Sequence, residues 1–225
     1  MIGLQILART RCIDAGRVDA FRNLPVANVS DCMTRMSAGG ARLRPMHQGG
    51  RLAGAALTVK TRPGDNLMIH QALQMAVPGD VIVVDGGGDL TNALIGELMT
   101  TYAQTRGVAG FVINGAIRDL DVIGNGTFPV YAAGVTHRGP YKDGPGEINV
   151  PIAIDGMVVE PGDLILGDAD GVLSVPLHAA DAILAAARAK VEAEQKTLQD
   201  IAAGQLDTSW IEATLRRIGC VVETK

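Results

Sequence analysis

Two short, apolar runs separated by one helix-like segment are the clearest pattern in this chain. The first run, residues 81–84, ends in Asp85, and the second is Val108–Ile113. Between them, residues 91–106 repeat apolar side chains at helical spacing, and Gly107 is a natural stop for that helix. Strands that are apolar throughout are typical of parallel sheets covered on both faces. The pattern therefore predicts a βαβ unit with parallel strands and a right-handed crossover.

Other segments continue the alternation of helices, strands and turns. We predict a helix over residues 15–38, with Asn28 or Ser30 as its cap, and another over Asn66–Met75. Strands are expected at Leu52–Lys60 and Pro129–Ala132, loops at 39–50, 86–89 and 136–150, and hairpin structure at 151–175. Within the last segment, Asp155-Gly156 is a hairpin turn signal.

A long helix is predicted at the C-terminal end, from about His178 to Ala203. One series of its positions has alternating spacings of three and four, as in a helix that packs along a seam: Leu184, Ala187, Val191, Glu194, Leu198 and Ile201. A carboxylate in such a seam is costly unless it is paired or lies at an edge, so the simplest interpretation puts Glu194 in solvent. No linker divides the chain, and we expect a single α/β domain over residues 1–225, with residues 178–225 as a helical arm.

Composition narrows the classes of function. The chain has 225 residues, of which 3% are aromatic, so its core must be aliphatic. A net charge of −4 gives no electrostatic footprint for nucleic acid. No apolar run is long enough for a membrane span, and the first residues lack the features of a signal peptide. Cys12, Cys32 and Cys220 are far apart and odd in number, which argues against a disulfide framework. We expect a cytoplasmic protein.

The candidate chemistry lies at the end of the second apolar run. Arg118 and Asp119 follow it closely, and Glu97 lies near the start of the preceding helix. Ligands of open parallel sheets bind beyond the carboxyl ends of the strands, where the amides of a following helix also favour an anion. Arg118 offers a planar fork for a carboxylate, whereas Asp119 and Glu97 are hard oxygen donors suited to Mg²⁺ or Mn²⁺. We expect the loop 85–89, after the first strand, to border the same crevice.

Each of these residues also has an ordinary structural explanation. Arg118 and Asp119 alone could form a surface ion pair, Glu97 could simply suit a helix start, and residues 86–88 could be a tight turn. Other chemistries have little support, because the four histidines lie far apart and no GxSxG, GxGxxG or phosphate-binding loop occurs. The motif alone leaves both interpretations open.

Several blocks, in order, resemble a known family. They are PGDNLMIHQAL, PGDVIVVDGGG, ALIGELMTTYAQTRGVAGFVINGAIRDLD, RGPYKDGPGEINVPI and PGDLILGDADGV. Together they resemble the 4-hydroxy-4-methyl-2-oxoglutarate / 4-carboxy-4-hydroxy-2-oxoadipate aldolase family, which includes a non-enzymatic relative, the regulator of ribonuclease E activity A. The resemblance runs from about Val29 to the C-terminal helix. It implies a layered α/β/α fold, like that of swivelling phosphohistidine domains, with a C-terminal helical arm.

The resemblance also implies a site and a reaction. The family's motif of an acid, twenty residues and Arg-Asp falls here on Glu97, Arg118 and Asp119, although its first acid is often Asp. Asp119 would bind Mg²⁺ or Mn²⁺, Glu97 would act through metal-bound water, and Arg118 would hold the pyruvyl oxygens. The amides of Gly96, Glu97, Leu98 and Met99 would receive the substrate carboxylate. The implied reaction is a class II pyruvate aldolase acting on 4-hydroxy-2-oxo-dicarboxylic or tricarboxylic acids, with oxaloacetate decarboxylation alongside.

Three further points depend on the resemblance. Such enzymes form trimers or hexamers, and an acid from a neighbouring subunit completes the site; Glu194 is the candidate here and Glu192 the alternative. The polar loop Arg138–Asp143 is expected to contact the distal half of the substrate. The competing function is a protein-binding regulator on the same scaffold, but regulator-type relatives lack the metal-binding Asp. A methyltransferase is a third alternative, but it would place a glycine-rich loop near the start of the chain, after the first strand of its domain, whereas these glycines follow Asp85 in the middle of the chain.

Overall fold

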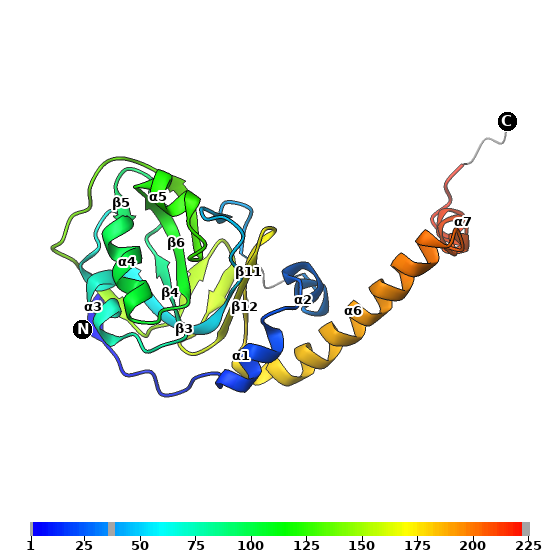
Figure 1. Ribbon diagram of the computed structural model, residues 1–225, viewed down its shortest axis with the longest axis horizontal. Helices are drawn as coiled ribbons and strands as arrows, with labels where there is room; N and C mark the ends of the chain where they lie inside the picture. The colour runs from blue at the N-terminus through cyan, green and yellow to red at the C-terminus, as the bar shows by residue number, and fades with distance from the viewer. Residues whose placement is uncertain (1, 36–38, 222–225) are drawn as a thin grey trace. The chain divides into compact units, whose positions relative to one another are not determined.

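The computed structural model describes residues 2–35 and 39–221 (Figure 1). The chain divides into two compact units, residues 1–187 and 188–225, and the boundary falls inside the long helix α6 (Ala180–Ala202). Every strand found in the described residues belongs to the first unit. The fold is mixed α/β, as predicted, with a C-terminal helix.

The first unit is built on one mixed sheet. Its central path runs β1 (Leu4–Ile6), β8 (Gly146–Ile148), β3 (Leu52–Thr61), β4 (Asp80–Asp85), β6 (Gly110–Ile117), β7 (Val130–Val135) and β2 (Arg44–Pro45). Off this path, β5 (Ala93–Ile95) pairs with β6, and β11 (Leu164–Asp168) pairs with β3 and with β12 (Gly171–Val175). Strands β3, β4, β6 and β7 are parallel neighbours, so the predicted parallel βαβ unit is confirmed.

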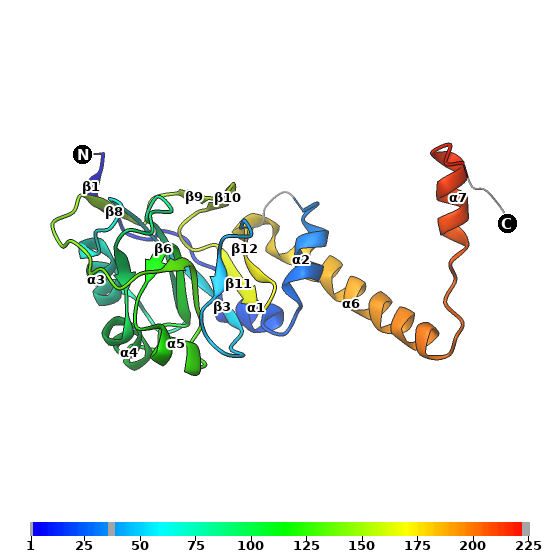
Figure 2. The ribbon, with the colours of Figure 1, turned by 90° about the horizontal axis from the view of Figure 1, so that it is seen from above.

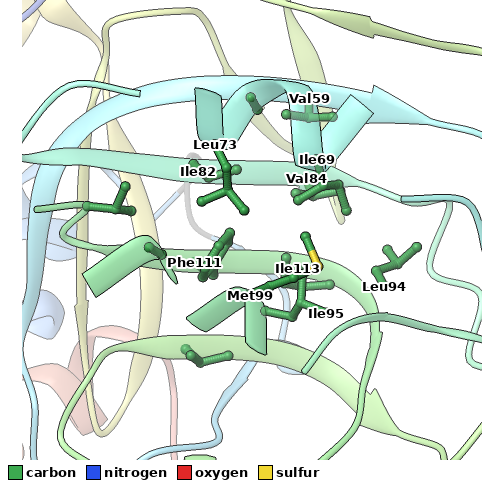
Figure 3. Close-up of a cluster of buried hydrophobic side chains, with 14 of the residues drawn as sticks. Val59, Ile69, Leu73, Ile82, Val84, Leu94, Ile95, Met99, Phe111 and Ile113 are labelled. Carbon is green, nitrogen blue, oxygen red and sulfur yellow. The ribbon is translucent and has the colours of Figure 1, made fainter. Parts of the chain in front are cut away.

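The two faces of the parallel strands are covered by different elements. Helices α3 (Leu67–Met75) and α4 (Glu97–Thr105) pack on one face, where Ile69 and Leu73 meet Ile82 and Phe111 (Figure 3). The opposite face is covered by the hairpin of β9 (Ile152–Ile154) and β10 (Met157–Val159), which lies away from α4 in Figure 2. Burial on both faces explains why β4 and β6 are apolar almost throughout.

The turn of this hairpin is the one that the sequence predicted. Asp155 and Gly156 both have positive φ, 47° and 87°, which matches the twist of the flanking strands. A third apolar cluster lies elsewhere in the unit, where α1 (Ala15–Phe21) and α2 (Val26–Cys32) pack with β11, β12 and the start of α6. The buried hydrophobic side chains of the first unit thus form three clusters between its helices, strands and hairpin.

The predicted helix over residues 15–38 is wrong as a single element. The chain forms α1 and α2 instead, because Pro25 stands before α2, where a helix interior would lose a hydrogen bond. Asp14 caps α1 by accepting a hydrogen bond from the Arg17 amide at 2.9 Å, whereas Asn28 and Ser30 lie inside α2 and cap neither helix. Residues 36–38 of the predicted helix lie outside the described residues.

Two further predictions need correction near the site. The predicted helix 91–106 begins only at Glu97, and residues 93–95 form strand β5 beside β6. The predicted loop 136–150 contains strand β8, which pairs with β1 and β3. The second apolar strand is longer than predicted, because β6 continues to Ile117 and delivers Arg118 directly to the end of the sheet.

The C-terminal helix is confirmed with bounds close to those predicted. A 3-10 turn (Leu177–Ala179) precedes α6, and α7 (Ser209–Arg217) follows it in the second unit. Ala187 is buried at the end of the first unit, whereas Leu198 and Ile201 are exposed. Among the helices of the described chain, none combines the length and hydrophobicity that crossing a membrane would require.

Candidate active site

The end of strand β6 turns sharply at Asp119. Arg118 donates its amide hydrogen to the Ile95 carbonyl at 3.0 Å, which continues the pairing with β5 by one residue. Asp119 then adopts a left-handed conformation, with φ of 58°, and begins helix α5 (Leu120–Asn125). Few residues other than glycine enter this region readily, but Asp and Asn do so most easily. The chain therefore leaves the strand direction at Asp119 and enters α5.

This turn brings Asp119 to the first residue of α4. Its Oδ2 accepts a hydrogen bond from the Glu97 amide at 2.9 Å, and Arg118 Nε lies 3.7 Å from the same oxygen. Both side chains are roughly 40% exposed, at 41% for Arg118 and 38% for Asp119. The sequence motif therefore corresponds to a real cluster at a strand end, open to solvent on one side.

Gly96 makes this close approach possible. A Cβ at position 96 would lie 2.3 Å from Asp119 Oδ2 and 2.9 Å from Arg118 Cγ, closer than any side-chain carbon can stand. Gly96 is also the residue before α4, where the chain is extended. The side chains of Arg118 and Asp119 thus occupy the space that a side chain at position 96 would need.

The start of α4 supplies backbone donors beside this cluster. The first amides of a helix have no acceptors within it, and the helix dipole favours an anion there. Two of the four amides predicted to receive a carboxylate are engaged in the chain, because Glu97 donates to Asp119 and Met99 donates to the Gly96 carbonyl at 3.1 Å. The Leu98 amide, at the second helical position, is the one best placed to donate to an anion.

A pocket of about 300 Å³ adjoins the cluster. Four predicted site residues line it: Gly96, Leu98, Met99 and Arg118. Its other walls come from β5, from the first turns of α3 and from the predicted distal loop, and they include Asn66, His70, Gly139, Pro140 and Lys142. Glu97 and Asp119 stand at its border through the hydrogen bond that joins them.

The loop after β4 does not line this pocket, contrary to our expectation. Asp85 Oδ1 instead accepts the Gly87 amide at 3.0 Å and the Asn114 side-chain amide at 3.2 Å. Gly87 and Gly88 have positive φ, which agrees with the tight-turn interpretation of the glycine run. The pocket is instead formed between β5, α3, α4 and the loop that carries Gly139 and Lys142.

Asn66 was not identified from the sequence, although it is the most buried polar side chain of the pocket. It is 3% exposed, and its Nδ2 donates to the Leu94 carbonyl at 3.0 Å. This leaves Oδ1 buried and without a donor among the described residues. A buried acceptor without a donor is costly, so Asn66 Oδ1 suits a ligand hydroxyl or a water. Its spacing of four from His70 on one helix was the available signal.

His70 carries the clearest electrostatic perturbation in the pocket. Burial lowers the pKa of its imidazole, and the nearby Lys142 ammonium lowers it further. We expect the ring to be neutral at pH 7 and to take up a proton only below its usual value of 6.5. The free protein therefore offers a neutral imidazole to a ligand in this pocket, beside the basic side chains of Arg118 and Lys142.

The His70 prediction can be measured by nuclear magnetic resonance of the imidazole ring, with the signal assigned through the His70→Gln variant. Because the folded pKa is depressed, the unfolded chain binds more protons just below pH 6.5, so this group lowers stability as pH falls through that range. The expected midpoint lies below 6.5, and the Lys142→Met variant should raise it. A midpoint at or above 6.5 would contradict the burial and the lysine contact.

The chemistry of the donors fits a hard divalent cation. Asp119 uses only Oδ2 in its hydrogen bond with the Glu97 amide, which leaves Oδ1 for a metal ion, and Glu97 is itself exposed. Within residues 2–35 and 39–221, no three histidine, cysteine or acidic side chains gather as a metal cage. Mg²⁺ is commonly held by one or two carboxylates with several waters, so one or two acids suffice.

Glu194 lies in the second unit and not among the pocket residues. Its Oε1 is 3.4 Å from Lys190 Nζ, one turn earlier in α6. The pairing agrees with an exposed position at the edge of the helix seam. The role expected for Glu194 or Glu192 in a neighbouring subunit stays a prediction.

Comparison with known proteins places this chain in a family. Residues 26–174 match the family described as RraA-like, Aldolase/RraA. A Halalkalibacterium halodurans protein, named as a candidate 4-hydroxy-4-methyl-2-oxoglutarate aldolase, is 38% identical over 186 residues, 81% of this chain and 89% of the relative.

Solved structures agree with this assignment. A Pseudomonas syringae pv. tomato protein has a TM-score of 0.77 at 28% identity, covering 86% of this chain and 95% of that one. The RNA-processing inhibitor RraA from Thermus thermophilus has a TM-score of 0.62 at 32% identity, covering 68% of this chain and 92% of its own. The fold, the matched residues and the relatives agree: this chain belongs to the RraA-like family of aldolases and RraA proteins.

Proposed function

We propose that this protein is a divalent-metal-dependent pyruvate aldolase that cleaves 4-hydroxy-2-oxo acids bearing a further carboxylate. The observation that carries the proposal is the cluster of Arg118, Asp119 and the α4 N-terminus at the border of one pocket. A guanidinium, a carboxylate and helix amides in one place suit a 2-oxo acid, which brings a carboxylate and a keto oxygen.

Two basic side chains line the pocket, which suits a substrate with two negative groups. Arg118 lies beside the start of α4, and Lys142 lies on the loop that forms another wall. Asn66 and the neutral His70 lie in the lining that α3 contributes. We assign the 2-oxo acid to Arg118 and the Leu98 amide, and the distal carboxylate to Lys142. A hydroxyl between them can donate a hydrogen bond to Asn66 Oδ1.

Asp119 would hold Mg²⁺ or Mn²⁺, with Glu97 acting through metal-bound water; the metal ion would supply Lewis-acid polarisation of a carbonyl. Arg118 binds the pyruvyl oxygens and stabilises the enolate charge that develops when the bond between C3 and C4 breaks. Loss of the proton of the 4-hydroxyl turns C4 into a carbonyl, and protonation of C3 completes pyruvate. Oxaloacetate decarboxylation passes through the same pyruvate enolate, so we expect it as a side activity.

The metal dependence gives a direct test. Wild-type protein stripped with EDTA should release no pyruvate from 4-hydroxy-4-methyl-2-oxoglutarate or oxaloacetate, and Mg²⁺ or Mn²⁺ should restore activity in a lactate dehydrogenase-coupled assay. Because Lys142 lines the pocket, a Schiff-base mechanism must be tested separately. Borohydride added with substrate should leave the activity and the protein mass unchanged. Activity that resists EDTA, together with a reduced adduct on Lys142, would overturn the proposal.

We propose further that the site is completed in a homotrimer or hexamer, by Glu194 or Glu192 of a neighbouring subunit. Exposed apolar side chains border the site, with Leu98 80% exposed on α4 and Val122 51% exposed on α5. Exposed apolar groups close together are typical of surfaces that another protein covers. Loss of activity in Glu194→Gln, with the oligomer intact by light scattering, is expected; full activity in both Glu194→Gln and Glu192→Gln would exclude this part.

The competing function is a protein-binding regulator, and the similarity to the Thermus thermophilus RNA-processing inhibitor supports it. It predicts no turnover of any oxo-acid and a stoichiometric macromolecular partner. Asp119 favours the enzyme, because its side chain is held at a helix N-terminus beside a pocket of small-molecule size. A specific partner captured by wild-type protein, with no metal-dependent pyruvate release, would reverse this ranking.

A further inference from the structure

One fully buried carboxylate beside the pocket has no part in the chemistry described so far. Asp65 has a relative exposure of 0% and lies just before α3. Its Oδ1 accepts the Leu67 amide at 3.0 Å, and its Oδ2 accepts the amides of Asp143 and Gly144, both at 2.8 Å. Arg62 Nη2 also donates to Oδ2, at 3.1 Å. Four donors converge on one carboxylate, a strong arrangement for a buried charge.

These hydrogen bonds join two walls of the pocket. Leu67 belongs to α3, the helix that carries His70, whereas Asp143 and Gly144 directly follow Lys142 on the distal loop. Backbone bonds support the same junction, because the Tyr141 amide donates to the Gly64 carbonyl at 2.8 Å and the Asn66 amide donates to the Tyr141 carbonyl at 3.0 Å. The position of Lys142 over the pocket is therefore set from residues 64–66.

The loop has a separate attachment at its other end. Asn92 Nδ2 donates to the Gly139 carbonyl, and the Ala93 amide donates to the Arg138 carbonyl at 2.8 Å. Neither bond involves Asp65. Loss of the Asp65 carboxylate should thus loosen residues 142–144, while residues 138 and 139 stay in place and Tyr141 keeps its backbone hydrogen bonds.

The chain contains two matched turns that lack this connection. Pro63-Gly64-Asp65, Pro78-Gly79-Asp80 and Pro161-Gly162-Asp163 each have a glycine with positive φ and a buried aspartate. Each aspartate accepts backbone amides and pairs with an arginine, and Asp163 does so with Leu177, Glu160 and Arg11. Only Asp65 among the three accepts amides from the loop that lines the pocket. The buried aspartate stabilises the turn in all three cases. Asp65 has an additional role because it also binds the loop that lines the pocket.

We infer that Asp65 is a positioning residue that holds Lys142 in place to receive the distal carboxylate of the substrate. The inference rests on the proposed function for the identity of the substrate. Asp65 acts through the loop and touches no reacting atom. Its loss should weaken recognition of the distal half while the Arg118 end, which handles pyruvate, remains intact.

The test is the Asp65→Asn variant. Asparagine has the same size, but one of its two terminal groups is an NH₂ that cannot accept a hydrogen bond. In one orientation of the side chain the amides of Asp143 and Gly144 lose their acceptor, and in the other the Leu67 amide loses its acceptor. We expect KM for a 4-hydroxy-2-oxo dicarboxylate to rise by about tenfold or more, as for loss of a charged hydrogen bond. Deuterium exchange of the pyruvate methyl group with Mg²⁺, which needs only the Arg118 end, should stay within about twofold. Hydrogen exchange at the Asp143 and Gly144 amides should accelerate.

Asp163→Asn is the matched control, because it perturbs an equivalent buried turn away from the pocket. It should change neither KM nor exchange at Asp143 and Gly144. The inference is overturned if Asp65→Asn leaves KM and amide exchange unchanged, or if it lowers pyruvate exchange as much as cleavage. A wild-type protein that turns over no oxo-acid, but whose Asp143 and Gly144 amides lose protection in Asp65→Asn, would overturn the proposed function and uphold the loop attachment.

Discussion

Asp119→Asn is expected to reduce metal-dependent pyruvate release by about 1,000-fold, which corresponds to roughly 4 kcal/mol of transition-state stabilisation. The fold should survive, because asparagine also tolerates the left-handed conformation at φ of 58°. Its side-chain oxygen can still accept the hydrogen bond that the Glu97 amide now gives to Oδ2 at 2.9 Å. The variant therefore removes a negative charge from the site and little else.

The measurement is kcat/KM in the coupled pyruvate assay at saturating Mg²⁺, beside circular dichroism and light scattering. Asp121→Asn is the matched control, since Asp121 is the exposed acid in the first turn of α5, two residues on. It should retain wild-type activity. A folded Asp119→Asn protein with wild-type kcat/KM would show that this carboxylate does not hold the metal.

Gly96→Ala is expected to lower kcat/KM by about 100-fold or more without unfolding the protein. The added methyl group would stand 2.3 Å from Asp119 Oδ2 and 2.9 Å from Arg118 Cγ, so both side chains must move. A shift of about 1 Å in a catalytic group costs on the order of 100-fold in rate. The same substitution would also disturb the approach of the Glu97 amide to Asp119.

Gly124→Ala is the control for glycine substitution near the site. A Cβ at position 124 would have its nearest neighbour, the Met46 carbonyl oxygen, at 3.6 Å, which is ordinary contact. Alanine is also the better helix former, so this α5 variant should be at least as stable as wild type. Equal activity in Gly96→Ala and wild type would mean that the close packing of Gly96 against Arg118 and Asp119 has no functional consequence.

The parallel strands and the site motif were predictable because their signals are local and strong. The apolar run from Val81 to Val84 has no competing periodicity, and a strand end followed by Arg118 and Asp119 leads to one edge of the sheet. The start of α4 was harder to predict, because Ala93, Leu94 and Ile95 also fit the helical spacing of the residues that follow. Pairing with β6, a long-range contact, decides that they form a strand.

The rest of the pocket depended on contacts between distant segments. Strand β8 is three residues long and exists because β1 and β3 pair with it, which no local pattern announces. The junction of Asp65 with Asp143 and Gly144 spans almost 80 positions of sequence and was likewise invisible. Asn66 and His70 were detectable as two polar residues four positions apart at the start of the predicted helix Asn66–Met75. The role proposed for Glu194 would depend on a second copy of the chain.

We propose above all that this chain releases pyruvate by metal-dependent cleavage at Arg118 and Asp119. The most direct measurement is the rate of pyruvate formation by wild-type protein over a panel of 4-hydroxy-2-oxo acids and oxaloacetate, with and without Mg²⁺ or Mn²⁺. We predict turnover of at least one dicarboxylic or tricarboxylic member, dependent on added metal and lost in Asp119→Asn. No turnover of any member with either metal present would contradict the proposed function.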